Sequence, residues 1–222
     1  MNNVAEISNW QLVVMGGWLM IPIALCSLLG IAYALELVFV LRRSKVVPKG
    51  LVEDLREALR NQDAAAALKL CDATPCALSS AVRAGIAEAS VADWDHVERA
   101  LEDAGAREVS LLRRKARPLR VISEICPLLG LLGTIQGMMG AFQSVSVSGG
   151  QLGKTEMFAG DIFTALVTTA AGLIVAIPAL FFFYSFSKRI DTLSSDLESA
   201  LTELFALLRP AAPGAVLVKP CE

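Results

Sequence analysis

Two long apolar segments of this sequence are interrupted by polar side chains, and these are the residues whose types could do chemistry. In the later segment, Asp161, Thr164 and Thr168 recur at steps of three and four, so a helix would place them on one face. Thr169 follows directly and widens this polar stripe. A threonine hydroxyl can solvate an ion or hydrogen-bond a carboxyl group, but it cannot exchange a proton near neutral pH.

The earlier segment carries a ladder of small residues around one hydroxyl, Thr134. The ladder has three- and four-residue spacing and consists of Gly130, Gly133, Gly137 and Gly140. Small residues at this spacing let another helix approach closely, and a hydroxyl at mid-depth requires a partner or water. Alternatively, each threonine donates to a carbonyl of the preceding turn and tolerates lipid. The stripe and the ladder together favour a pair of packing and pore-lining helices.

The composition is that of a membrane protein. The chain has 222 residues, of which 55% are hydrophobic, and its mean hydropathy is +0.56. Ordinary soluble domains contain roughly 45–50% apolar residues. The five cysteines have no disulfide-framework spacing, so we expect reduced thiols that act as small hydrophobic side chains.

The sequence contains no catalytic constellation. It lacks a plausible Ser/His/Asp set, and its glycines do not form a phosphate-binding loop. The lone histidine, His96, is interpreted as a solvated helix residue, and no Cys/His cluster has zinc-site spacing. The chain is therefore predicted not to be an enzyme and to need neither a metal nor another cofactor.

Three apolar segments are each long enough for a spanning helix of about 20 residues. They alternate with four more polar regions, which divides the chain into 1–9 (outer tail), 10–41 (first span), 42–118 (cytoplasmic region), 119–142 (second span), 143–157 (outer loop), 158–187 (third span) and 188–222 (cytoplasmic helix and tail). The N-terminal tail has no basic residue before its apolar run, so the run is interpreted as a retained span rather than a signal peptide.

Basic residues set the predicted orientation. They cluster behind the first span, before the second and behind the third, as Arg42, Arg43, Lys45, Lys49, Arg113, Arg114, Lys115, Arg117, Arg120, Lys188 and Arg189. By the positive-inside rule, the N-terminus is outside and the C-terminus is in the cytoplasm. Glu36 and Glu124 then lie near the cytoplasmic ends of their spans, and Asp161 lies near the outer end. With no titratable group at mid-bilayer, an acid that carries protons must come from another chain.

The region between the first two spans is predicted to be helical. Residues 51–71 have one apolar face, Thr74-Pro75 breaks the pattern, a second helix begins near Ser79, and a third runs from Val91 into the second span. Extended helices are favoured over a small, separately folded domain. Behind the third span the helical pattern continues to Leu208, and the proline-rich tail is expected to be irregular.

Two stretches, PLLGLLGTIQGMMGAF (127–142) and ALVTTAAGLIVAIPALFFFYSF (165–186), together resemble the MotA/TolQ/ExbB proton channel family, closest to its ExbB/TolQ branch. The resemblance implies a three-span, all-α subunit that forms a fivefold ring around helices of an ExbD/TolR-like partner. That partner would carry a protonatable aspartate, and the complex would drive a TonB- or TolA-like protein. MotA-type proteins, with a fourth span, fit less well.

The resemblance also assigns roles to residues. Thr134 and Thr169 match the pore-lining threonines of the family. Thr164 occupies the place of a frequent glutamate, and Asp161, one turn earlier, is an alternative acid. Helix packing is expected from Gly172, Pro127 and Pro178 as well as the glycine ladder. Glu124 beside Arg120 is either part of a cytoplasmic exit or a plain interfacial ion pair.

The function that follows is a proton-channel subunit of a bacterial inner-membrane complex of the ExbB–ExbD kind, which energises a TonB-like protein for outer-membrane transport. The alternatives are a TolQ-like subunit that maintains the cell envelope and a non-conducting, oligomeric membrane scaffold. A small-solute transporter is disfavoured, since inverted repeats and broken helices are not visible.

Overall fold

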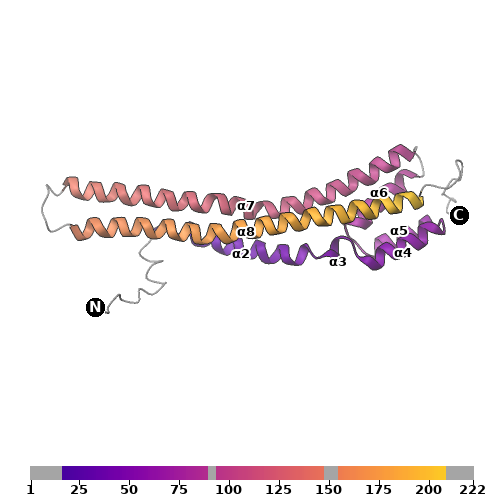
Figure 1. Ribbon diagram of the computed structural model, residues 1–222, viewed down its shortest axis with the longest axis horizontal. Coiled ribbons are helices and arrows are strands. Elements are labelled where there is room, and N and C mark those ends of the chain that lie inside the picture. Colours follow the sequence, from indigo (N-terminus) through magenta and orange to yellow (C-terminus); the bar gives the residue numbers. More distant parts are fainter. Residues whose placement is uncertain (1–16, 90–93, 148–154, 209–222) are drawn as a thin grey trace. The chain divides into compact units, whose positions relative to one another are not determined.

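The computed structural model describes residues 17–89, 94–147 and 155–208, and the regular elements in these residues are all α-helices (Figure 1). In chain order they are α2 (Met20–Val40), α3 (Arg43–Val46), α4 (Lys49–Arg60), α5 (Ala64–Ala73), α6 (Ala77–Ala89), α7 (Trp94–Val147) and α8 (Thr155–Leu208). The predicted all-α class is confirmed. The expectations for the tails at 1–9 and 209–222 and for the middle of the outer loop lie outside the described residues.

The chain divides into two compact units. The first, called the membrane unit, comprises Met1–Glu36 and Arg117–Tyr184, and the second, called the polar unit, comprises Leu37–Ala116 and Ser185–Glu222. The helices α2, α7 and α8 each contribute residues to both units.

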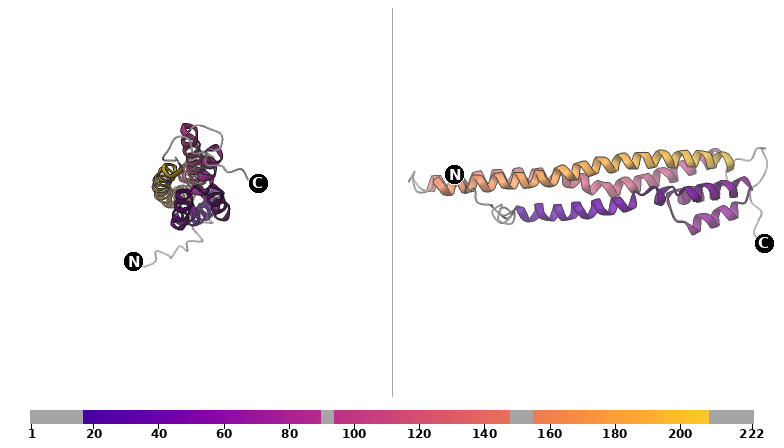
Figure 2. Two further views of the ribbon diagram at one scale, coloured as in Figure 1. Left: turned by 90° about the vertical axis from the view of Figure 1, so that its right-hand side faces the viewer. Right: turned by 60° about the horizontal axis from the view of Figure 1, so that its bottom comes forward.

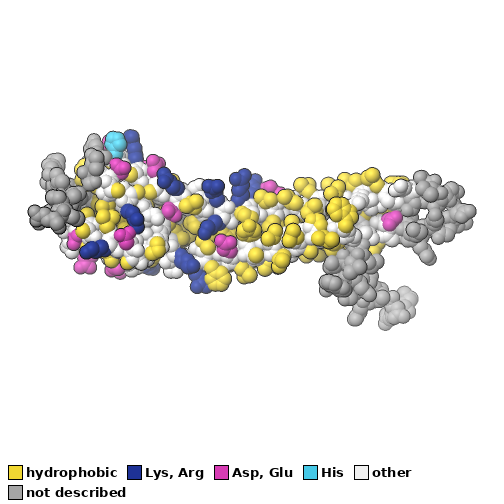
Figure 3. Space-filling view, turned by 180° about the vertical axis from the view of Figure 1, so that it is seen from behind, with side chains coloured by type: hydrophobic (Ala, Val, Ile, Leu, Met, Phe, Trp, Pro, Cys, Tyr) yellow, Lys and Arg dark blue, Asp and Glu magenta, His cyan; other side chains and the backbone are white. Residues whose placement is uncertain are grey.

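Three helices are long and apolar enough to cross a membrane, namely α2, α7 and α8. Their apolar windows are only 11%, 22% and 22% buried within the chain, so most of this surface faces outward. Most of the exposed large hydrophobic residues belong to these helices, and hydrophobic side chains cover a continuous stretch of the face drawn in Figure 3. Such a surface is stable in lipid or against other apolar helices, and the chain is a multi-pass membrane protein.

The first of these helices is preceded by a turn. In the described residues α2 starts at Met20, whose backbone N–H donates to Gly17 O at 3.2 Å. Gly17 has a φ of 70°, in the left-handed region that glycine enters at little cost, so the chain turns here just before α2. Residues 10–16 lie outside the described part.

In the membrane unit α2 packs against α7 and α8 around one hydrophobic cluster. The core cluster comprises Ile122, Cys126, Ala176 and Ala179, against which Cys26 and Tyr33 of α2 pack. The indole N–H of Trp18 donates to the Gln136 side-chain oxygen at 3.0 Å and ties the start of α2 to α7.

The polar unit has its own hydrophobic core. Its fully buried side chains come from α4, α5, α6, α7 and α8 and include Leu55, Cys71, Leu78, Val82, Val97, Leu197 and Leu204. The Arg56 guanidinium of α4 pairs with Glu203 of α8 at 2.7 Å, and Figure 2 shows the short helices alongside the C-terminal part of α8. The sequence posed extended helices and a small, separately folded domain as alternatives. The structure has both, since the long helices α7 and α8 contribute to the compact polar unit.

The continuous helix expected over 51–71 is wrong, because α4 ends at Arg60 and α5 begins at Ala64. Gln62 adopts a φ of 57°, which a helix interior does not allow. Asp63 then caps α5, since its side chain accepts from the Ala66 N–H at 2.8 Å. The apolar residues before and after the break are still at helical spacing from each other, so the spacing did not reveal the break.

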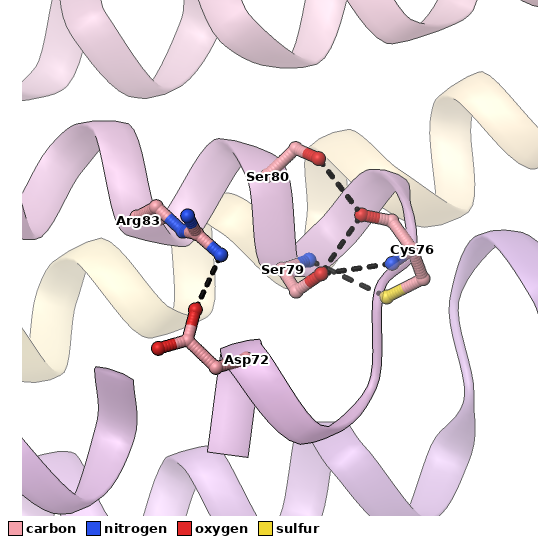
Figure 4. Close-up of polar contacts among 5 residues, drawn as sticks. All are labelled: Asp72, Cys76, Ser79, Ser80 and Arg83. Carbon is pink, nitrogen blue, oxygen red and sulfur yellow. Dashed lines mark hydrogen bonds and ion pairs between the residues drawn. The ribbon is translucent and has the colours of Figure 1, made fainter. Parts of the chain in front are cut away.

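The next helix, α6, begins at Ala77, close to the predicted start near Ser79, and Cys76 and Ser79 cap it reciprocally (Figure 4). The Cys76 N–H donates to Ser79 Oγ at 2.8 Å, and the Ser79 N–H donates to Cys76 Sγ at 3.4 Å. Arg83 pairs with Asp72 and joins α6 to the end of α5. Burial raises the pKa of the nearby Cys71 thiol to about 11.

Two of the expected continuations are present. The helix α7 runs from Trp94 through Pro118 into the second apolar segment, and α8 continues from the third apolar segment to Leu208. The bilayer boundaries along these helices stay predictions.

Candidate functional site

The glycine ladder of α7 packs against α8 of the same chain. A Cβ built on Gly130 would lie 2.9 Å from the Thr169 Cα, and one built on Gly172 would lie 2.5 Å from the Cys126 carbonyl oxygen. Real Cβ atoms essentially never come this close to backbone atoms. The two backbones are therefore in direct contact, as small residues allow between membrane helices. We call this contact the α7–α8 seam.

Two further glycines extend the seam. A Cβ on Gly133 would lie 2.2 Å from Thr168 Oγ1, and one on Gly137 would lie 2.6 Å from the Ala165 Cβ. At Gly140 the nearest atom would be the Asp161 Oδ2, at an ordinary 3.9 Å. The close packing thus extends from Cys126 and Gly172 to Gly137 and relaxes by Gly140.

The predicted proline contributions to packing differ from each other. Pro127 is half-buried beside the seam residue Cys126, whereas Pro178 is exposed. The buried side of α8 there runs through Gly172, Ala176 and Ala179, and Pro178 points away from it. Packing within this chain therefore does not use Pro178.

Thr168 lies inside the seam and departs from the predicted polar stripe. It is only 2% exposed, and its hydroxyl donates to the Ala165 carbonyl at 2.7 Å on its own helix. Its side chain fills the space that Gly133 leaves open. Within this chain Thr168 is a packing residue rather than a surface hydroxyl.

Thr169 joins the two helices by a hydrogen bond. Its hydroxyl donates to the Gly130 carbonyl of α7 at 2.8 Å, and its side chain is half-buried. A hydroxyl oxygen that donates one bond still has lone pairs able to accept another. Thr169 can therefore accept a hydrogen bond from a protonated carboxyl group while it holds α7.

The other polar residues of the predicted path are half-buried. Thr134 donates to the Leu131 carbonyl at 2.7 Å, which is the local bond that threonines in membrane helices commonly make. Thr164 and Asp161 are also half-buried, and the Asp161 carboxylate lies near Gly140. The structure thus places partly accessible polar groups along the edge of the seam.

The membrane unit lacks charged residues through the middle of its helices. No acidic or basic residue occurs from Met20 to Leu35, from Ile125 to Gln143 or from Ile162 to Tyr184. Within the described residues no group of three or more His, Cys, Asp and Glu side chains could hold a metal ion. The seam offers hydroxyls and carbonyls, which solvate a charge or a proton-bearing group but do not take up the proton.

Arg120 and Glu124 form an ion pair on one side of α7, with Nε and Oε1 separated by 2.9 Å. Both side chains are about 60% exposed, and the Arg120 guanidinium lies 6.0 Å from the centre of the Phe183 ring. The i,i+4 geometry and exposure are those of a surface pair, which contributes little to stability.

Sequence reasoning missed two contacts of this region. It treated Thr168 and Thr169 as one stripe, although only Thr169 crosses to α7. It also did not pair Trp18 with Gln136. The separation of Thr168 from Thr169 could have been predicted from the spacing. Thr168 lies three residues after Ala165 and four before Gly172, which places it on the small-residue side of α8.

Comparison with known proteins agrees with this architecture. Residues 75–199, which contain most of α6 to α8 and the whole seam, match the MotA/TolQ/ExbB proton channel family. The chain belongs to this family. By that description its members are proton channels, in agreement with the prediction that the chain is not an enzyme.

Individual relatives carry names from both systems of the ExbB/TolQ branch. The chain is 36% identical over 115 residues to the biopolymer transport protein ExbB of Xanthomonas campestris, covering 49% of this chain and 45% of that protein. It is 30% identical over 167 residues to the putative biopolymer transport protein ExbB-like 3 of Synechocystis sp., covering 75% and 79%. It is 33% identical over 116 residues to the Tol-Pal system protein TolQ of Haemophilus influenzae, covering 52% and 50%. The match thus spans about half the length of the Xanthomonas and Haemophilus relatives.

Proposed function

We propose that this chain is the channel subunit of an ExbB–ExbD-like complex that couples proton flow across the bacterial inner membrane to movement of a TonB-like protein. In this proposal several copies, five by the resemblance, surround helices of a single-span partner of the ExbD/TolR kind. The observation that carries the proposal has two parts. The hydroxyls of Thr134 and Thr169 lie at the edge of the seam, and the middle of the membrane helices contains no acidic or basic residue.

The proposed path uses hydroxyls from both seam helices. A bare carboxylate at mid-bilayer costs several kcal/mol, so a carboxyl group passes more easily in its protonated form, whose O–H needs a hydrogen-bond acceptor. Thr169 and Thr134 supply such acceptor oxygens at the edge of the seam, whereas the buried hydroxyl of Thr168 serves packing. The partner supplies the aspartate that takes up and releases the proton.

Asp161 and Thr164 mark the outer entrance of the path in this proposal. Both are half-buried and lie one turn apart on α8, at the end of the seam where Asp161 faces Gly137 and Gly140. The Asp161 carboxylate provides a negative group that attracts protons towards the hydroxyls behind it. Arg120 and Glu124 lie at the other end of α7's charge-free stretch, where the proton leaves.

A non-conducting scaffold is less well supported. That function would use the glycine ladder only to join separate chains, but the ladder is already occupied by α8 of the same chain.

The test of the proposed function is proton flux into vesicles that contain the chain alone or with an aspartate-bearing, single-span partner. Co-purification with an ExbD-like or a TolR-like partner distinguishes the TonB-linked duty from the TolQ-like alternative.

The proposed orientation places the N-terminus outside and the polar unit in the cytoplasm, since the basic residues gather beside the polar unit. A green fluorescent protein fused behind residue 222 is expected to fluoresce in cells, and alkaline phosphatase fused at the same position is expected to be inactive. Active phosphatase with a dark fluorescent fusion would reverse the orientation.

A further inference from the structure

An open groove of about 510 Å³ lies in the polar unit, lined by residues of α8 and α3. Three of its lining residues are cations, Arg43, Lys188 and Arg189, and one is an acid, Asp196. Three positive groups against one negative group leave a net charge of +2. A groove of this size and charge can hold a phosphate group.

The cations of the groove differ in how they are engaged. The Arg43 guanidinium pairs with Asp196 at 3.1 Å. Arg189 Nε donates to the Leu41 carbonyl at 2.9 Å, just behind the end of α2, and its terminal nitrogens remain donors. Lys188 is exposed and has no ion-pair partner in the described part of the chain. Lys188 is thus the cation most available to an anion from outside.

The position of the groove along the chain is that of a membrane interface. Lys188 and Arg189 are the first charged residues after the third apolar segment, and Arg43 lies directly behind the first. In the same unit, Val38 and Phe39 of α2 are 48% and 54% exposed, and Arg42 stacks over the Phe39 ring at 5.4 Å. Phe186 lines the groove, and the bond from Arg189 to the Leu41 carbonyl links the groove to the chain two residues after Phe39, so a ligand there meets apolar surface as well as positive charge.

We propose that this groove binds the phosphate of an anionic phospholipid, with the acyl chains lying along the exposed apolar residues at the end of α2. Basic pockets between membrane helices on the cytoplasmic side are suited to such headgroups, because phosphate pairs with Lys and Arg while the chains stay in the bilayer. The combination of cations and apolar surface selects a lipid over a soluble phosphate. The site is independent of proton conduction.

The test measures how tightly the purified protein in detergent retains added dioleoylphosphatidylglycerol, with dioleoylphosphatidylcholine as the neutral lipid, by native mass spectrometry. The wild-type chain is expected to prefer phosphatidylglycerol. Lys188→Gln should weaken its binding about fivefold, the effect typical of one basic residue near an anionic lipid surface. Lys69→Gln, the same change at an exposed lysine of α5 outside the groove, should not alter it.

A substitution of opposite sign keeps the test independent of folding defects. Asp196→Asn removes the acid of the groove and the partner of Arg43, so it should strengthen phosphatidylglycerol binding. Equal retention of the two lipids would overturn the proposal, as would equal effects of Lys188→Gln and Lys69→Gln. Full competition by soluble glycerol 3-phosphate at the lipid's concentration would show a free-phosphate site and would also overturn it.

Discussion

Gly172→Ala is expected to destabilise the membrane unit strongly, although it adds a single methyl group. The new Cβ would lie 2.5 Å from the Cys126 carbonyl oxygen, which is backbone and cannot rotate away. The helices must separate, and overpacking of this kind costs about 1–3 kcal/mol. Separation also weakens the hydrogen bond from Thr169 to the Gly130 carbonyl, so the loss of stability should lie at the upper end of this range.

The measurement is the fraction of purified protein that stays monodisperse after heating, compared across a temperature series. Gly160→Ala is the matched control on the same helix, because a Cβ there would meet nothing within 4 Å. Gly140→Ala is a second control, with only an ordinary 3.9 Å contact to Asp161. If Gly172→Ala and Gly160→Ala lose their monodisperse fraction at the same temperature, the close approach of α7 and α8 at this site is wrong.

Thr169→Ala is expected to remove most partner-dependent proton flux. The substitution takes away the hydroxyl that crosses the seam and that can accept from a protonated carboxyl group. A protonated carboxyl group that loses this acceptor is held less well at mid-bilayer, so flux should fall by at least about tenfold, equivalent to about 1.4 kcal/mol. Thr169→Ser keeps the hydroxyl and should retain most of the flux.

Thr168→Val provides the contrast for this prediction. Valine keeps the shape that fills the space at Gly133 and removes a hydroxyl that bonds only to carbonyls of its own helix. Its flux should stay near that of the wild type, measured in vesicles with the same amount of assembled complex. Loss of flux in Thr168→Val with normal flux in Thr169→Ala would exchange the proposed roles of the two residues.

Residue spacing was sufficient to predict the long apolar helices and the small-residue ladder. A ladder of glycines in an apolar segment has few physical purposes, and close helix approach is the main one. Spacing alone did not identify the partner of the ladder, because any helix with small residues would serve. The structure shows that α8 of the same chain is that partner, with Ala165, Thr168 and Gly172 on its facing side.

Adjacent residues of one type were harder to separate. Thr168 and Thr169 differ by about 100° around α8, which is enough to bury one hydroxyl and to direct the other to the Gly130 carbonyl. The break at 61–63 was missed for a related reason. Apolar spacing reports which face is buried, whereas the positive φ of Gln62 is a property of the backbone that the spacing does not report.

The claim at the centre of the proposed function is that this chain holds only part of a proton path. Its membrane helices carry hydroxyls at the seam but no acidic or basic residue from Ile125 to Gln143 or from Ile162 to Tyr184. The most direct test is the proton flux of vesicles that contain the purified chain alone, under an imposed pH gradient and membrane potential. No flux above that of empty vesicles is expected, and flux should appear when a single-span partner bearing the aspartate is added. Sustained flux from the chain alone would contradict the claim.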